Sequence, residues 1–237
     1  AIYTEAKEGR GTEHGGAYLD ISHKPADYVK KKLPSMYHQF RELADVDITK
    51  GRRGVGPTGH YRVGGRRVGA ETAQASVPGL FGAGEAAAGL HGANRLGGNS
   101  LSDLLVFGRR AGLAAAEHAK QVEPAPVDGA QIEEAEREML APFERSEGDS
   151  PYQIHRELQE TMQNLVGIFR NEADLQRGLA EVRALKERAS RVRVEGSRLF
   201  NPGWHLARDL KSMLTVSEAV ALSALARRES RGAHSRI

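Results

Sequence analysis

The chain has 237 residues, 39% of them apolar and 27% charged, which is enough to form one large domain or two small ones around a buried core. Its 34 basic and 31 acidic side chains leave a formal charge of only +3, and aromatic residues make up 5%, so the composition argues against a nucleic-acid-binding protein. The absence of cysteine excludes disulfides, thiolate metal sites and iron–sulfur ligands within this chain, and no metal site is expected.

The first fifty residues are predicted to be rich in surface turns, with a short strand at residues 17–21. Between residues 25 and 43, apolar side chains recur at spacings of three and four, which is typical of a helix. Pro34 interrupts this pattern and therefore predicts two shorter helices in place of one long helix.

Residues 51–101 are dense in glycine, which indicates turns between short strands. The apolar residues 77–81 are predicted to begin a buried strand, in a sheet whose other strands come largely from upstream sequence. A helix with an apolar face is predicted from Ser100 to about Val122.

The segment Glu-Pro-Ala-Pro-Val-Asp-Gly at residues 123–129 is the best linker candidate, and a charged helix is predicted after it at residues 131–140. Apolar side chains at helical spacing then predict three long helices near residues 151–171, 173–194 and 204–228. Because such amphipathic helices are not stable alone, they imply an antiparallel bundle.

Three features could carry chemistry, but each has a simpler explanation when it is taken alone. Gly82–Ala87 fits a loose Gly-x-Gly-x-x-Ala pattern, which is weak without a ribose-binding acid about 20 residues further on, and also fits an ordinary turn. Arg95 stands among glycines and suits a dicarboxylate through its forked guanidinium, but it could equally be a surface arginine. Asn99 and Ser100 are preferred helix caps at a helix end that carries partial positive charge.

Three segments together resemble a known family. The sequence His-Gly-Ala-Asn-Arg-Leu-Gly-Gly-Asn-Ser-Leu at residues 91–101, preceded by Gly-Leu-Phe-Gly-Ala-Gly-Glu at 79–85, closely resembles the flavin-contacting core of succinate dehydrogenase and fumarate reductase flavoprotein subunits. Residues 58–65 (Thr-Gly-His-Tyr-Arg-Val-Gly-Gly) resemble another segment of that family, from which they depart at their second, fifth and sixth positions. Residues 229–236 (Glu-Ser-Arg-Gly-Ala-His-Ser-Arg) resemble the family's tail motif.

The resemblance implies roles for individual residues. His60 and Arg95 are expected to bind the carboxylates of the substrate. The residues expected to contact FAD are Glu85, Asn99, Ser100 and Leu101. His91 is expected to be structural. The family's proton-transferring arginine, its phosphate-binding glycine fingerprint and the histidine that can bond the flavin covalently are expected upstream of this chain; Arg10 matches a later, structural Glu-Gly-Arg-Gly and is not assigned.

The resemblance also implies an α+β fold, with an incomplete flavin-binding α/β portion followed by a C-terminal three-helix antiparallel bundle. Residues 1–50 correspond to a remnant of the capping domain that closes over the substrate, and residues 51–122 to the C-terminal part of the FAD-binding domain. Residues 123–150 are expected to form the linker and charged helix, and residues 151–237 the C-terminal helical domain. The chain thus corresponds to the C-terminal half of the family protein and is expected to bind no FAD and to be inactive by itself.

The function implied is that of the subunit that interconverts succinate and fumarate by hydride transfer with FAD and passes electrons to an iron–sulfur subunit, and through it to a membrane anchor and quinone. No apolar run approaches the ~20 residues that span a bilayer, so a peripheral location on the cytoplasmic face of the inner membrane, held by partner subunits, is expected. The direction of reaction stays open. Two alternatives also remain: a related flavin oxidase such as L-aspartate oxidase, which usually diverges in the second half of the tail motif, and a non-catalytic helical interaction module.

Overall fold

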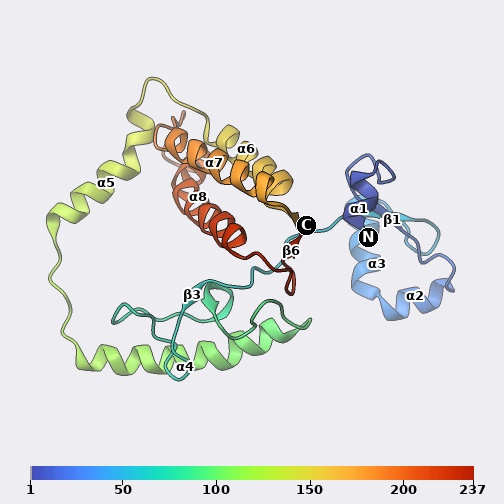
Figure 1. Cartoon of the computed structure of the whole chain (residues 1–237), viewed down its shortest axis with the longest axis horizontal. Coiled ribbons are helices and arrows are strands. Elements are labelled where there is room, and N and C mark those ends of the chain that lie inside the picture. The colour runs from blue at the N-terminus through green and yellow to red at the C-terminus, as the bar shows by residue number, and fades with distance from the viewer. Residues whose placement is uncertain (1) are drawn as a thin grey trace. The chain divides into compact units, whose positions relative to one another are not determined.

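A computed structural model describes residues 2–237 (Figure 1). The chain divides into two units, Ala1–Arg62 and Val63–Ile237, and each unit has its own internal contacts. Among the described residues, no helix combines the length and the apolar character that crossing a membrane requires.

The first unit combines three short helices with one pair of strands. Its elements in chain order are α1 (Ile2–Lys7), β1 (Ala17–Leu19), α2 (Ala26–Lys32), α3 (Pro34–Ala44) and β2 (Arg53–Val55). The two strands pair antiparallel, with Leu19 opposite Arg53. Pro34 occupies the first position of α3, where its missing N–H costs nothing, so the prediction of two short helices is confirmed.

The second unit is mainly helical, with strands of only two residues. Its elements are β3 (Arg66–Arg67), the 3-10 helix η1 (Gly84–Ala86), β4 (Ala87–Ala88), α4 (Asn99–Gln121), α5 (Gly129–Glu144), α6 (Pro151–Leu165), β5 (Phe169–Arg170), α7 (Glu172–Ala189), α8 (Pro202–Ala226) and β6 (Ser235–Arg236). Two parallel pairs, β3 with β4 and β5 with β6, join segments that are distant in sequence. A fold with few strands and a C-terminal helical domain agrees with the expected fold class.

The prediction of a buried strand at residues 77–81 is wrong, because this segment forms a turn. The amide of Leu80 donates to the carbonyl of Val77 at 3.2 Å, and Gly79 has a φ of +79°. Proline at the second and glycine at the third position of a turn favour this geometry, and here Pro78-Gly79 outweighed the apolar neighbours. Val77 is accordingly 52% exposed.

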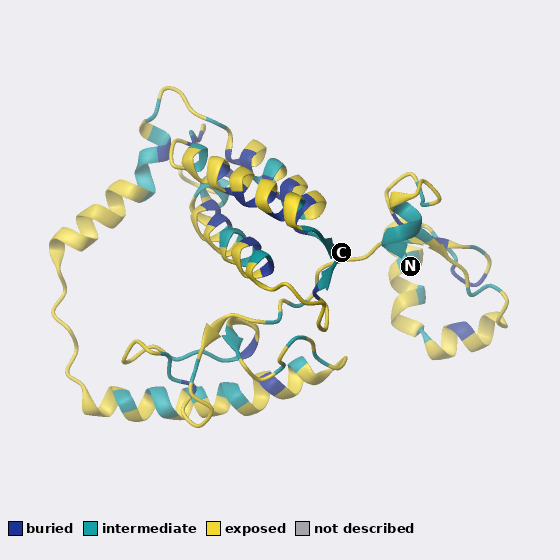
Figure 2. Ribbon diagram, viewed as in Figure 1, coloured by how far each residue is buried: buried dark blue, intermediate teal, exposed yellow. Residues whose placement is uncertain are grey.

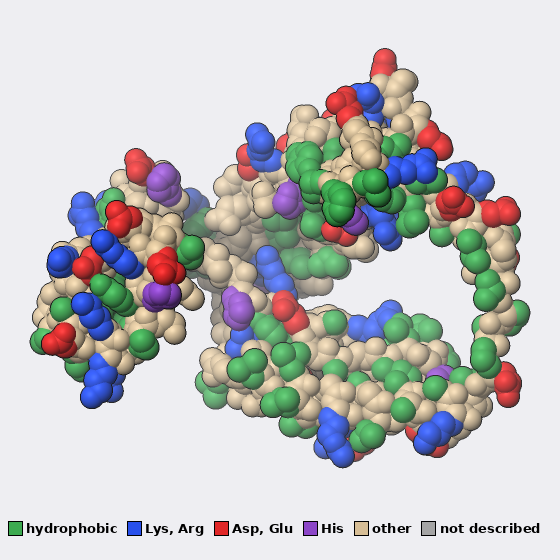
Figure 3. Space-filling view, turned by 180° about the vertical axis from the view of Figure 1, so that it is seen from behind, with side chains coloured by type: hydrophobic (Ala, Val, Ile, Leu, Met, Phe, Trp, Pro, Cys, Tyr) green, Lys and Arg blue, Asp and Glu red, His purple; other side chains and the backbone are tan. Residues whose placement is uncertain are grey.

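The helix expected from Ser100 begins one residue earlier, at Asn99. Gly98, with a φ of +86°, holds the cap position, so neither Asn99 nor Ser100 is the cap. Much of the predicted apolar face is exposed, with Leu101 and Leu105 exposed by 65% and 76%, and hydrophobic side chains are visible at the surface of this part of the chain in Figure 3. The described residues therefore leave that face of α4 largely uncovered.

The linker and the helix after it match the sequence pattern closely. Residues 123–128 adopt neither helix nor strand, as expected for the proline-rich linker. The following helix is longer than predicted, because Asp128 caps it by accepting a hydrogen bond from the amide of Ala130 at 2.9 Å. Pro142 lies near the end of α5.

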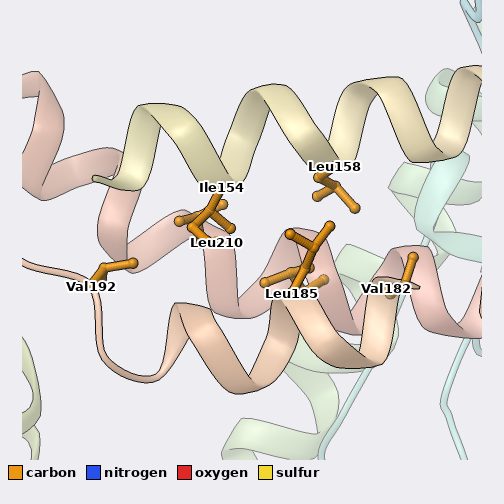
Figure 4. Close-up of a cluster of buried hydrophobic side chains, with 7 residues drawn as sticks. Ile154, Leu158, Val182, Leu185, Val192 and Leu210 are labelled. Carbon is orange, nitrogen blue, oxygen red and sulfur yellow. The ribbon is translucent and has the colours of Figure 1, made fainter. Parts of the chain in front are cut away.

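The three helices α6, α7 and α8 form the predicted bundle, and consecutive helices run in opposite directions (Figure 1). Buried positions recur along their facing sides (Figure 2). In the core, apolar side chains from the three helices and the segment after α7 point toward one another (Figure 4): Ile154, Leu158, Val182, Leu185, Val192, Leu210 and Leu214. α6 ends six residues before the predicted boundary of 171, because residues 169–170 leave the helix and pair with β6.

An ionic cluster ties the ends of two bundle helices together. The guanidinium of Arg188, near the end of α7, contacts Asp149 at 2.9 Å and also pairs with Glu157 of α6. The hydrogen bonds from Arg188 hold the pKa of both carboxyls below their usual range. Because these groups are about one-third exposed, the cluster orients the helix ends more than it stabilises the fold.

Leu210→Ala tests the bundle core. Leu210 is fully buried in α8, so removing its methyl groups leaves a cavity, and the free energy of unfolding of the full chain should fall by about 2–5 kcal/mol. The matched control is Leu222→Ala on the same helix, where the side chain is 42% exposed, with an expected loss below about 1 kcal/mol. Denaturant unfolding followed by far-UV circular dichroism measures both, and equal losses would contradict this core assignment.

Candidate functional site

A glycine-rich segment, residues 89–98, connects β4 to α4 and carries Arg95; we call it the Arg95 loop. The amide of Arg95 donates to Oδ1 of Asn94 at 2.9 Å, and its guanidinium donates to the carbonyl of Leu96 at 3.2 Å. Arg95 is half-buried. A guanidinium carries five donors in a planar fork, and this geometry matches the two oxygens of a carboxylate.

The start of the Arg95 loop is held against α4 by a buried polar contact. His91 Nε2 lies 3.2 Å from Oδ2 of Asp103, and the two side chains are only 10% and 5% exposed. Asp103 belongs to the second turn of α4, so this pair fixes the loop to the helix that follows it. The contact supports the structural role expected of His91.

Glu85 lies in η1, which packs against the same helix. A Cβ at Gly84 would come within 2.6 Å of Cδ2 of Leu104, and Gly84 has a φ of +73°. Glycine therefore allows both the left-handed backbone and the close approach to α4. Glu85 itself is exposed.

The N-terminal end of α4 is accessible beside these two segments. Asn99 and Leu101 are exposed and Ser100 is half-buried. Within the turn, the amide of Leu101 donates to the carbonyl of Gly98 at 3.0 Å. The helix dipole gives this end partial positive charge, which favours a negatively charged or electron-rich group next to it.

These are the residues expected to line one edge of a flavin, and residues 82–87 do not form a dinucleotide-type turn for its diphosphate. The helix end and the exposed carboxylate of Glu85 could face the polar edge of an isoalloxazine ring. The Gly-x-Gly-x-x-Ala pattern at residues 82–87 leads into a three-residue 3-10 helix and β4, not into the α-helix that a dinucleotide fingerprint requires. Among residues 2–237, no cluster of His, Asp and Glu side chains could hold a metal ion.

His60 belongs to a different unit from the other predicted site residues. It is exposed and follows β2, in a stretch without regular secondary structure. Glu85, Arg95 and the residues at the start of α4 belong to the second unit, where the contacts above hold their segments together. The convergence of His60 with Arg95 therefore stays a prediction.

The C-terminal tail, residues 229–237, also touches the Arg95 loop. The amide of Ala233 donates to the carbonyl of Ala93 at 3.3 Å. The sequence identified both motifs but not their contact, because a periodic pattern does not report which distant segments meet. Their shared resemblance to a single family was the only available signal.

His234 anchors this tail and has a shifted pKa. It is 9% exposed, and Arg170 donates to its Nδ1 at 2.8 Å. Burial, followed by the charge of Arg170, lowers the pKa of His234 below its ordinary value of 6.5. Because an arginine can only donate, Nδ1 must accept and the proton sits on Nε2, which faces the carbonyl of Arg227 at 3.1 Å.

Two family models match different parts of the chain. The model described as "Fumarate reductase flavoprotein C-term" matches residues 155–237, and that described as "FAD binding domain" matches residues 1–101. Over 236 residues the chain is 40% identical to one component of the fumarate reductase (CoM/CoB) of Methanothermobacter marburgensis. The chain belongs to the family of succinate dehydrogenase and fumarate reductase flavoprotein subunits.

Solved structures of this flavoprotein family have the same fold over nearly the whole chain. Sdh1 of Mycobacterium smegmatis, solved in complex with UQ1, is 57% identical, with a TM-score of 0.89 over 99% of this chain. FrdA of the E. coli quinol fumarate reductase is 34% identical, also with a TM-score of 0.89 over 99% of this chain. The chain spans only part of these relatives: 42% of the Methanothermobacter protein, 40% of Sdh1 and 41% of FrdA.

The buried neutral His234 predicts a pH dependence of stability. Since its pKa is lower in the folded state, the unfolded chain takes up a proton more readily as the pH falls. The free energy of unfolding of the full chain should therefore be fully retained above pH 6.5 and decrease as the pH falls below that value. Denaturant unfolding over a pH series measures this, and His234→Gln should flatten the decrease. If the free energy of unfolding falls equally steeply with pH in parent and variant, the lowered pKa of His234 is not the cause.

Proposed function

We propose that this chain is a segment of a flavoprotein subunit that interconverts succinate and fumarate with FAD and passes the electrons to an iron–sulfur subunit. The observation that carries the proposal is that the loop with Arg95 is held on α4, the helix against which η1 also packs. There the family motif expects a carboxylate-binding arginine beside the flavin edge. The match to the FAD-binding family model over residues 1–101 argues against a front half that merely connects a helical interaction module.

The substrate would be held by its two carboxylates. We assign one carboxylate to the guanidinium of Arg95, whose planar fork matches two carboxylate oxygens, and the other to His60. Holding both ends fixes the carbon atoms between them, which is how binding energy lowers the barrier of a reaction that needs close approach. FAD, when bound, takes up or supplies the hydride.

The wall for the flavin would come from Glu85, Asn99, Ser100 and Leu101. The first turn of α4 presents backbone amides and partial positive charge, which favour the electron-rich edge of a flavin. Glu85 is exposed on η1 and can accept hydrogen bonds from a ligand. None of these residues is assigned the role of moving the proton.

The electron partner is proposed from the relatives. Structures similar to this chain include a complex with UQ1 and a quinol fumarate reductase, which supports quinone as the final electron partner. One relative is named fumarate reductase (CoM/CoB), so the proposal of quinone rests on the solved structures and not on that relative. We propose attachment to the cytoplasmic face of the inner membrane through a membrane anchor and an iron–sulfur subunit. A flavin oxidase such as L-aspartate oxidase is disfavoured, because residues 233–236 continue the tail motif as Ala-His-Ser-Arg.

Arg95→Ala tests the substrate assignment in the intact flavoprotein that contains this segment. Removing one side of a desolvated charge pair should cost roughly 2–5 kcal/mol of binding, seen in kcat/KM for succinate or fumarate. Arg95→Lys keeps the charge but loses the fork, so its activity should be intermediate. Arg109→Ala, an exposed arginine further along α4, is the control and should behave like the parent. Unchanged KM and kcat in Arg95→Ala would refute the assignment.

The chain of residues 1–237 by itself is expected to bind no FAD tightly. Its described residues offer a wall for the flavin edge without a strand–turn–helix fingerprint for the diphosphate. Purified chain should therefore be colourless and should not oxidise succinate, as an absorption spectrum and an activity assay will show. A yellow preparation that releases stoichiometric flavin on denaturation would mean that these residues bind the cofactor unaided.

A further inference from the structure

The C-terminal tail makes a narrow turn where it meets the Arg95 loop. The amide of Arg231 donates to the carbonyl of His234 at 2.9 Å, and the amide of His234 donates back to the carbonyl of Arg231 at 3.1 Å. Gly232 lies inside this turn with a φ of +59°, a left-handed conformation that favours glycine. The turn therefore presents bare main chain at Gly232.

That main chain lies directly against Ala93, two residues before Arg95. A Cβ at Gly232 would lie 2.3 Å from the carbonyl oxygen of Ala93 and 2.6 Å from its carbonyl carbon. Both atoms belong to the backbone, so a side chain at this position cannot be accommodated by rotating another side chain. Either the tail or the Arg95 loop has to move.

The tail is unlike a free chain end, because several contacts attach it to the helical bundle. His234 is held by Arg170 and by the carbonyl of Arg227 at the end of α8. β6 pairs in parallel with β5, and Arg236 forms an ion pair with Glu172 at the start of α7. A displacement at Gly232 is therefore expected to move the Arg95 loop as well as the tail.

The Arg95 loop is itself held at two points. The pair of His91 and Asp103 holds its start on α4, and the bond between Ala233 and Ala93 holds its middle on the tail. Arg95 lies two residues after Ala93, the second of these anchors. Fixing a binding side chain before the ligand arrives reduces the entropy lost on binding.

We propose that the C-terminal tail positions Arg95 for dicarboxylate binding, with Gly232 as the positioning residue that sets how closely the tail approaches the loop. This inference rests on the proposed function, since it takes Arg95 to bind a substrate carboxylate. The helical bundle thereby supports the substrate site through the tail. A side chain at position 232 pushes the peptide of Ala93 away and displaces Arg95 with it.

Gly232→Ala in the intact flavoprotein tests this with malonate as the probe. Malonate carries two carboxylates but lacks the adjacent CH₂ pair from which hydride and proton are removed, so its affinity reports binding without reaction. Titration calorimetry should show affinity weaker by about 10-fold to 100-fold, as for a displacement near 1 Å. KM for succinate should rise more than kcat falls. Hydrogen exchange of residues 91–98 should accelerate, while that of α6 and α7 stays unchanged.

Gly196→Ala is the matched control. Gly196 also has a positive φ, +90°, but a Cβ there would meet only the side chain of Asn201 at 3.7 Å. An alanine there also strains the backbone but does not press on the Arg95 loop, so malonate affinity should equal that of the parent. In the Arg95→Ala background, Gly232→Ala should cause no further loss, because the tail acts through Arg95.

His234→Gln, which releases the tail from Arg170, is a second variant and should also weaken malonate binding.

The outcomes separate this inference from the proposed function. If Arg95→Ala leaves malonate affinity unchanged, the proposed function fails, and the role of the tail fails with it. If Arg95→Ala weakens malonate binding while Gly232→Ala and His234→Gln leave both the affinity and the hydrogen exchange of residues 91–98 unchanged, only the positioning role is wrong. An equal loss from Gly232→Ala with and without Arg95 would also overturn the positioning role.

Discussion

The packing of apolar side chains between α6, α7 and α8 is the contact on which the rest of the second unit depends. Ile154, Leu185 and Leu210 meet in a core that excludes water, and burial of this kind is the main favourable term in folding. The core fixes the ends of the helices, and those ends carry β5 and the start of the tail. Because the tail contacts Ala93, the packing of this core also affects where the Arg95 loop lies.

Charged side chains in this unit divide into those that hold the fold and those that the proposed function assigns to a ligand. Arg188 and Arg236 pair with carboxylates that join separate elements, and the charge of Arg170 lies against the neutral ring of His234. Arg95 lies among glycines, and its guanidinium donates to the carbonyl of Leu96.

Local patterns in the sequence predicted most of the helices. Apolar spacing located the three bundle helices, and Pro34 marked the break between α2 and α3. The errors have physical causes: Pro78-Gly79 imposed a turn where apolar residues indicated a strand, and Gly98 took the cap position from Asn99 because its backbone could adopt a positive φ. For the site, motif resemblance selected Arg95 and Glu85, and the structure joins their segments to α4.

The sequence by itself therefore determined the helical bundle, the linker before it and the family, because helix periodicity, proline and glycine act over a few residues and a motif is read along the chain. Only the tertiary structure decided that His91 pairs with Asp103 and that the tail meets Ala93. These contacts join residues far apart in sequence, and their geometry depends on how the helices pack. The close approach of Gly232 to the Arg95 loop has the same origin: a glycine in the sequence shows that the backbone is permissive, but only the fold shows what lies against it.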